Sequence, residues 1–424
     1  MILTARLLLP ISGPPIVDGG LVIRDGAICA VGKASELIRD FATEPHDDLG
    51  SAVLLPGLVN AHTHLELTGL RGRLPFSKSF TEWAIALLDL RADLDDEFFA
   101  TSARLGATIL LRSGVTCVAD ITASGSSVAP LKAAGLRGII FQEILGPHPE
   151  QATERLDAAE KALRALQLQT GGTLLSVGLS PHAPYSLSEP LLLRCAELLQ
   201  RLRLPATIHL AESPEEVTYI GLGLGPIATR LLPAVGRHSP SHRLCGESPT
   251  AFLDRAGLLS DRLLAVHAVH VGMSDLQLLK QRGVALAVCP RSNHNLSVGT
   301  APLPRCLAAS LRVGLGTDSL ASNETLSLWD EMRFAHRLYG EAVTAQQLVA
   351  MATLGGAAAL GMAGAIGSLA PGKRADLTAL TIDDLDDADP YRSLVDQASD
   401  DLVVLSMVEG KILYQREGAK WNCH

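Results

Sequence analysis

The stretch "VLLPGLVNAHTHLELTG" (residues 53–69) joins an apolar run to two histidines, His62 and His64. A short apolar run bounded by Pro or Gly is typical of a strand that is buried on both faces. Because side chains at positions i and i+2 of a strand point to the same side, both imidazoles can converge on one metal ion. With 13 histidines in the chain, a single His-x-His pair also arises by chance. The other ligands must therefore be sought elsewhere.

Seven further apolar runs with strand character follow the first, and segments with helical periodicity separate them. The clearest helical segments are 149–169 and 188–202. The eight runs lie at 53–59, 115–119, 136–141, 173–179, 205–210, 263–267, 284–289 and 312–316. Strands that alternate with helices in this way predict an α/β fold, a parallel (β/α)8 TIM-type barrel. An open doubly wound sheet is the alternative, but no Gly-rich phosphate loop follows the first run.

The two ends of the chain differ from this middle part. Near the N-terminus, "LVIRDGAICAVG" places two strands around Asp25-Gly26, and near the C-terminus "VVLSMVEGKILYQ" places two around Glu409-Gly410. Both are signals for a β-hairpin. We therefore predict one small β-sandwich domain formed by both termini, residues 1–57 and 366–424, with the barrel at 58–365.

The composition excludes several classes of protein. The 424 residues carry a net charge of −9, with 4% aromatic residues and no basic stripe, which argues against a nucleic-acid partner. The seven cysteines are odd in number and never form C-x-x-C, so we interpret them as free thiols of a reducing compartment, the cytoplasm. The oligomeric state stays open, a homo-oligomer included.

Two segments bear on a membrane location. The N-terminal "MILTARLLLPISGPP" has too short an apolar patch for a signal peptide. Residues 351–370 carry no charge and are long enough to span a bilayer, but they are mostly Ala and Gly. We predict a small-residue helix packed inside a soluble protein, and no membrane partner.

In a (β/α)8 barrel the chemistry lies at the C-terminal ends of the strands, so those ends are the place to look for further ligands. Taken singly, each polar residue there has an ordinary structural explanation, and "GTDS" alone is a common turn. Their joint placement is what indicates a site. The ends of runs one, four, five, six and eight carry, in that order, His62 with His64, His182, His209 with Glu212, His267, and Asp318.

This set resembles the amidohydrolase superfamily, in its mononuclear aminohydrolase (deaminase) branch. The likeness covers nearly the whole chain: "VLLPGLVNAHTH" is similar to the family's entry into the barrel, and "GSLAPGKRADLTAL" (367–380) to its return to the small domain. Binuclear members carry a carboxylated Lys at the end of strand four, where this chain reads "SVGLSPHAPYS" without a Lys. The resemblance therefore implies a hydrolase with one metal ion.

The resemblance also implies a role for each residue. His62, His64, His209 and Asp318 would hold one divalent ion, Zn²⁺ in first place and Fe²⁺ in second. Asp318 and His267 would orient the attacking water, and Asp318 could take its proton. Glu212 would pass a proton to a ring nitrogen of the substrate, and ammonia would leave.

The substrate class follows from finer likenesses. "PHAPYS" and "HLAES" resemble enzymes that deaminate adenine-bearing small molecules, and "HTHLELTG", "FTEWAIALLDLR" and "FQEILG" are most similar to 6-aminodeoxyfutalosine deaminases of menaquinone biosynthesis. S-adenosylhomocysteine/methylthioadenosine deaminases come next. Hydrolases of guanine, pyrimidines or chlorotriazines remain open, as does a non-catalytic scaffold, although every expected ligand is present.

Such a substrate needs polar partners beyond the adenine. Glu143 and His182 lie at rim positions suited to the middle of the molecule, and a benzoate in a partly apolar pocket needs a cation. A surface or packing role also explains any one of the candidate arginines. We predict that at least one of them pairs with the carboxylate: Arg71, Arg73, Arg91 or Arg291. The segment 211–248 is expected to be a loop long enough to cover the barrel mouth.

Overall fold

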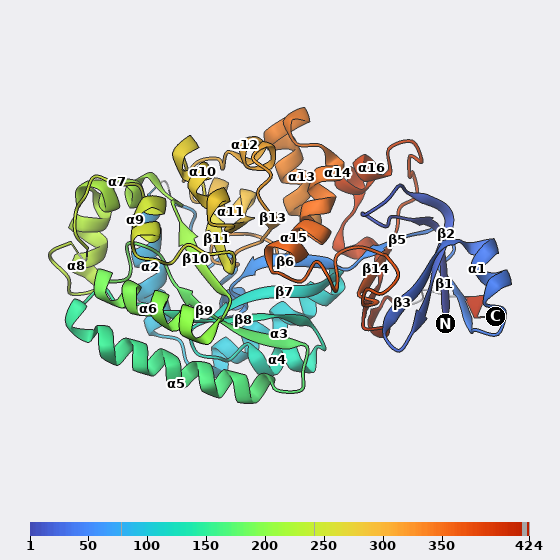
Figure 1. Cartoon of the computed structure of the whole chain (residues 1–424), viewed down its shortest axis with the longest axis horizontal. Coiled ribbons are helices and arrows are strands. Elements are labelled where there is room, and N and C mark those ends of the chain that lie inside the picture. Colours follow the sequence, from blue (N-terminus) through green and yellow to red (C-terminus); the bar gives the residue numbers. More distant parts are fainter. Residues whose placement is uncertain (78, 241, 418–421, 424) are drawn as a thin grey trace.

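The structure is a computed structural model that describes residues 1–77, 79–240, 242–417 and 422–423. Figure 1 shows two bodies side by side, a barrel of strands with surrounding helices and a second sheet that holds both ends of the chain. The cysteines with described side chains are free thiols, four of them buried. The thiol predicted at Cys423 lies outside the described side chains.

The barrel contains eight parallel strands among the described residues, in the order in which they follow along the chain. Backbone amides of Thr317 and Asp318 donate to the carbonyl oxygen of His62 at 3.1 and 3.0 Å, which brings the last strand beside the first. This arrangement confirms the predicted (β/α)8 fold. The strands are β6 (Leu58–Thr63), β7 (Val115–Thr122), β8 (Arg137–Ile144), β9 (Leu175–Pro181), β10 (Ala206–Leu210), β11 (Leu263–His267), β12 (Ala285–Val288) and β13 (Val313–Leu315).

Helices connect these strands and cover the barrel from outside. The amphipathic segments at 149–169 and 188–202 fold as predicted, into α5 and α6. The barrel helices are η1 (Leu65–Leu70), α2 (Phe80–Ala92), α3 (Asp96–Arg112), α4 (Val128–Ala133), η2 (Pro149–Gln151), α5 (Ala152–Thr170), α6 (Glu189–Leu202), α7 (Pro214–Leu222), η3 (Ile227–Leu231), α8 (Leu232–Ala234), α9 (Pro249–Arg255), α10 (Met273–Gln281), α11 (Pro290–Asn295), α12 (Leu303–Ala308), α13 (Leu328–Tyr339), η4 (Gly340–Ala342), α14 (Ala345–Ala350), η5 (Met351–Gly355) and α15 (Gly356–Ala359).

The second sheet combines strands from both ends of the chain, as predicted. β5 pairs with β1 on one side and with β14 on the other, which joins the N-terminal strands to the C-terminal ones. Both predicted hairpins form. The strands are β1 (Ile2–Leu8), β2 (Ile16–Arg24), β3 (Ala27–Lys33), β4 (His46–Asp48), β5 (Ala52–Pro56), β14 (Leu377–Thr381), β15 (Val403–Val408), β16 (Lys411–Gln415) and β17 (Asn422–Cys423); the accompanying helices are α1 (Ala34–Asp40), α16 (Pro390–Gln397) and η6 (Asp400–Leu402).

The first apolar run, 53–59, is not one strand but parts of two. β5 belongs to the second sheet and β6 to the barrel, and the predicted domain boundary after residue 57 falls between them. A Cβ added at Gly57 would lie 2.1 Å from Oγ1 of Thr116, so only glycine fits where the chain crosses between the sheets. The sequence could not reveal this break because the residues on both sides of it are equally apolar and equally buried.

The small-residue segment 351–370 is helical only as far as Ala359, and the prediction of a longer helix was wrong. Gly361 follows with φ 72°, a left-handed conformation that ends helices. The close packing does occur, since a Cβ on Gly314 would come within 2.9 Å of Cα of Gly356. Among the described residues, no helix is both long and apolar enough to cross a membrane.

The segment 211–248 is not the irregular loop that we expected. Its first part folds into α7, η3 and α8, and the described residues after Ala234 form no further helix or strand before α9. Ser213 caps α7, because its hydroxyl accepts a hydrogen bond from the amide of Glu216 at 3.1 Å, and Pro214 begins the helix. A helical segment can present a fixed apolar face to the barrel mouth, and this one does so.

Candidate active site

Four side chains from three strand ends meet at the mouth of the barrel. His62 lies in β6, His64 just beyond it, His209 in β10, and Asp318 in the turn after β13. The Nε2 atoms of His64 and His209 are 3.4 Å apart, and Oδ1 of Asp318 lies 3.5 Å from Nε2 of His62 and 3.8 Å from Nε2 of His64. The chain thus gathers three imidazole nitrogens and one carboxylate oxygen around one point.

Asp318 is held firmly in its ionised form. Its Oδ2 accepts hydrogen bonds from the hydroxyls of Ser292 at 2.6 Å and Ser322 at 2.9 Å, and its Oδ1 accepts one from the amide of Ser319 at 2.8 Å. Burial alone would raise the pKa of this carboxyl, but the contact of its Oδ1 with Nε2 of His62 and the electrostatic influence of the neighbouring imidazoles lower the pKa well below its ordinary value. A buried carboxylate that stays ionised is suited to bind a cation.

The ring orientations of two histidines are fixed from behind. Nδ1 of His209 lies 2.8 Å from the carbonyl oxygen of His182, and Nδ1 of His267 lies 2.8 Å from Oδ1 of Asn293. In each ring Nδ1 is therefore the donor, and Nε2 is left with a lone pair that faces the centre of the site.

The donor set fits a metal ion. His62, His64 and His209 form one group, and His62, His267 and Asp318 another, in which the candidate ligand atoms all lie within 4.8 Å of one another. Among the described residues, Nε2 of His62 and Nε2 of His267 are buried without a hydrogen-bond partner. Burial lowers the pKa of His64 and His209 well below the usual value, and that of His267 to about 4, so these rings are neutral and can act as ligands.

Glu212 stands beside this cluster as a neutral acid. Its backbone amide and that of Ala211 both donate to the carboxylate of Glu216 at 2.9 Å, which fixes the turn after β10. Its Oε1 lies 3.5 Å from Nε2 of His267. Burial, and then the negative charge of Asp318, raise the pKa of Glu212 well above its ordinary value. The group can therefore hold a proton and give it to a ligand.

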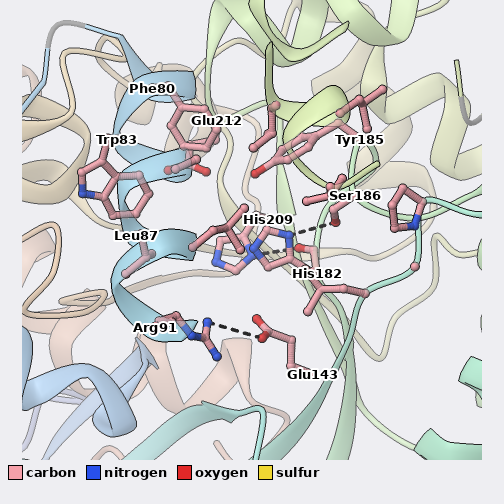
Figure 2. A pocket seen from close by; sticks show the side chains of 18 of the residues that line it. Phe80, Trp83, Leu87, Arg91, Glu143, His182, Tyr185, Ser186, His209 and Glu212 are labelled. Atoms are coloured by element: carbon pink, nitrogen blue, oxygen red, sulfur yellow. Dashed lines mark hydrogen bonds and ion pairs between the residues drawn. The ribbon is translucent and has the colours of Figure 1, made fainter. Parts of the chain in front are cut away.

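A cavity of about 600 Å³ opens above these groups. One face of α2 forms a wall of it, and η3 and α8 contribute Leu231 and Leu232 to the lining. Figure 2 shows Phe80, Trp83, Leu87 and Arg91 of α2 along the same side of the pocket. A cavity of this size, largely apolar with a few polar groups at the bottom, suits a small organic molecule larger than a single base.

Of the predicted substrate-binding residues, Glu143, His182 and Arg91 line this pocket. Arg91 and Glu143 face each other, with Nη1 of the arginine 3.9 Å from Oε2 of the glutamate.

The other candidate arginines are not among the residues that line the pocket. Nη2 of Arg291 contacts Glu324 at 2.8 Å, and the guanidinium of Arg73 lies over the ring of Phe98. Arg291 thus points away because it lies in α11, which packs against α13, and its guanidinium lies over the ring of Phe334. Arg71 lies outside the lining as well.

Several lining residues were missed from the sequence, among them Phe80, Tyr185 and Arg155. Tyr185 belongs to "PHAPYS" (181–186), which lies just after the strand predicted at 173–179. Its position near a strand end could therefore have indicated it. Arg155 belongs to α5, and only the three-dimensional arrangement brings that helix to the barrel mouth.

Comparisons with known proteins bear on what this pocket does. The sequence profile of the amidohydrolase family matches residues 53–413. The 5-methylthioadenosine/S-adenosylhomocysteine deaminase of Syntrophobacter fumaroxidans is 35% identical over 370 residues, which cover 85% of this chain and 79% of the relative. The aminodeoxyfutalosine deaminase of Deinococcus radiodurans is 34% identical over 348 residues, 80% of each chain. The crystal structure of an adenosine deaminase from Xanthomonas campestris with bound zinc superposes with a TM-score of 0.81 at 28% identity and covers 97% of this chain and 92% of that one.

Proposed function

This chain belongs to the amidohydrolase family and is a hydrolase that acts on C–N bonds, and from this we propose that it deaminates an adenine-bearing nucleoside with an extended substituent. 6-Aminodeoxyfutalosine is our first candidate, which would place the chain in menaquinone biosynthesis. 5′-Methylthioadenosine and S-adenosylhomocysteine are the alternative. The observation that carries the proposal is the convergence of three histidines, Asp318 and a protonated Glu212 at the bottom of one pocket. A cytoplasmic location and assembly into a homo-oligomer stay predictions from the sequence.

His62, His64, His209 and Asp318 would hold one divalent ion. The neutral rings of His64 and His209, the ionised carboxylate of Asp318 and the unpartnered Nε2 of His62 fit such a group. When bound, a divalent ion supplies Lewis acidity that lowers the pKa of water toward neutrality. Zinc is the first choice, supported by the zinc in the Xanthomonas campestris relative and by the N/O donor set, with iron second.

The residues of the chain supply the proton transfers. Glu212 donates its proton to the ring nitrogen of the adenine, while water adds to the adjacent carbon that bears the amino group. Asp318, ionised and fixed by its serine contacts, takes the proton of that water with His267 beside it. The proton then passes from Asp318 to the amino group. The C–N bond breaks and ammonia leaves, while the remaining hydroxyl proton returns to Glu212 as the carbonyl forms.

The outer pocket supports a nucleoside with an apolar extension. Trp83, Leu87 and Leu231 line the space beyond the polar floor. Arg155 also lines the pocket, and within the described part of the chain it has no carboxylate partner; its Nη2 donates to Oε1 of Gln151 at 3.3 Å. A benzoate at the end of an apolar linker would meet a cation there. This favours a substrate that ends in a carboxylate, as 6-aminodeoxyfutalosine and S-adenosylhomocysteine do, over 5′-methylthioadenosine, which needs no cation.

A substrate panel tests the proposal. We expect ammonia release from 6-aminodeoxyfutalosine with a kcat/KM at least about tenfold above that for S-adenosylhomocysteine, 5′-methylthioadenosine and adenosine, equivalent to roughly 1.4 kcal/mol of transition-state discrimination. A preference for one of the thioethers would move the assignment to the alternative. No ammonia release from any of the four by the metal-loaded protein would overturn the deaminase itself.

A further inference from the structure

Glu143 is the one acidic side chain at the pocket whose charge the proposed reaction does not use. It is the second-last residue of β8, and only 3% of its side chain is exposed. No residue in the described part of the chain donates a hydrogen bond to its carboxylate, and its contact with Arg91 at 3.9 Å is too long to be one. A buried carboxylate without a donor is costly, so the arrangement points to a partner that comes with the ligand.

Among the described residues, the buried carboxylates that lie away from the pocket do not share the feature. Glu66 accepts from Ser124 Oγ at 2.7 Å and from the amide of Ser126 at 3.0 Å. Glu216 accepts from two backbone amides, and Glu331 from Nδ2 of Asn323 and the amide of Arg291. The fold thus supplies donors where a carboxylate is structural, and it supplies none to Glu143.

The position of Glu143 suggests which part of a ligand it meets. Figure 2 shows Glu143 and Arg91 on the opposite side of His182 and His209 from Glu212. If the adenine lies against Glu212, as the proposed reaction requires, the sugar attached to it extends toward Glu143. The charge of Glu143 also reaches His182, since it raises the pKa of that ring against the larger, lowering effect of burial.

The charges decide what chemical group fits. Arg91 offsets the charge of Glu143 but cannot satisfy its oxygens at 3.9 Å. A carboxylate placed here would face Glu143, and a cation would face Arg91, so neither is favoured. A neutral group with two neighbouring O–H donors can give one hydrogen bond to each carboxylate oxygen, while Arg91 donates to the hydroxyl oxygens. The 2′- and 3′-hydroxyls of a ribose are such a pair.

We propose, resting on the proposed function, that Glu143 backed by Arg91 binds the vicinal hydroxyls of the substrate ribose and makes the enzyme selective for ribonucleosides over deoxynucleosides. Arg91 is then occupied by Glu143 and the sugar, and it is not the partner of a substrate carboxylate. The sequence predicted the two residues as separate contacts, whereas the structure places them together.

The test uses the best nucleoside of the substrate panel together with its 2′-deoxy and 3′-deoxy forms. For the metal-loaded wild type we expect each deoxy form to lose at least tenfold in kcat/KM. In Glu143→Gln, which keeps size but removes the second acceptor, the ribose preference should fall below about threefold. Arg91→Lys keeps the positive charge and should retain most of the preference.

The control is Glu215→Gln, because Glu215 accepts a hydrogen bond from Ser79 near the pocket but does not line it. This variant should keep the wild-type preference. Damage to the fold would lower kcat/KM for the ribose and deoxy forms alike, so the ratio isolates the contact with the sugar. Calorimetric binding of the same compounds provides a second readout that does not need turnover.

Equal kcat/KM for ribose and deoxy forms in the wild type, or an unchanged ratio in Glu143→Gln, would overturn the role of Glu143 and leave the deaminase standing. If no nucleoside of the panel is deaminated or bound, the proposed function fails, and this inference fails with it.

Discussion

The floor and the wall of the pocket are built in different ways. On the floor, each reactive group is fixed by a partner behind it: His209 by a backbone carbonyl, His267 by Asn293, and Asp318 by two serines. The wall, made by α2, η3 and α8, offers mainly apolar side chains. An exposed ion pair between Glu82 of α2 and Arg230 of η3 connects these two elements of the wall. The comparison indicates that the strand ends hold the catalytic groups in place, while the segments that connect the strands determine which substrate fits.

The largest effect should come from the floor. Glu212→Gln removes the transferable proton but keeps the shape of the side chain. We expect kcat to fall on the order of 10²-fold or more, as for loss of a general acid, with metal content unchanged. Steady-state kinetics and elemental analysis of the same sample measure both. Loss of the metal would mean that Glu212 is a ligand, and retention of kcat would exclude its role as the acid.

On the wall, Trp83→Ala should change binding and spare the chemistry. Loss of the apolar contact between the indole and the substrate should weaken binding by about 1.5–3 kcal/mol. We therefore expect KM to rise roughly 10- to 100-fold while kcat stays within about threefold. The matched control is Arg230→Gln, which breaks an exposed ion pair worth less than about 1 kcal/mol and should leave KM and kcat unchanged. A fall in kcat as large as that of Glu212→Gln would show that wall and floor do not act separately.

A smaller effect should appear in the pH dependence of the unfolding free energy, through Glu331, which lies behind the floor. Glu331 supports Asn323 in the turn after Asp318, and burial raises its pKa from 4.5 to about 8. Folding therefore favours the protonated form. This contribution is complete below pH 4.5 and is lost as the pH rises through 8.

Denaturant unfolding at pH 5 and pH 8.5 measures this loss. In Glu331→Gln the decrease in unfolding free energy between the two pH values should be smaller than in the wild type by at least about 1.4 kcal/mol, one pKa unit. The exposed Glu341→Gln serves as control and should follow the wild type. An identical pH dependence in Glu331→Gln would contradict the shifted pKa.

The floor was predictable from the sequence because strand geometry is regular. Because side chains alternate between the two faces of a strand, His62 and His64 were expected on the same face. Because parallel strands of a barrel end at one rim, His209 and Asp318 were expected beside them. The wall was not predictable. The pairing of Arg91 with Glu143 and the displacement of Arg291 depend on how segments rotate and pack, which no local pattern encodes. The start of α7 was different, because Ser213-Pro214 is a local helix signal that our prediction of a loop did not use. The break at Gly57 was hidden for the same reason, since tertiary contacts with Thr116 impose it.

The central claim is that His62, His64, His209 and Asp318 form one metal site, and the metal content of the purified protein tests it most directly. We expect about one equivalent of a divalent ion per chain in the wild type, by the mononuclear donor set, and a loss of most of it in His209→Ala. Glu215→Gln, outside the pocket lining, should retain the full equivalent. Two tightly held equivalents in the wild type, or full occupancy in His209→Ala, would contradict the account.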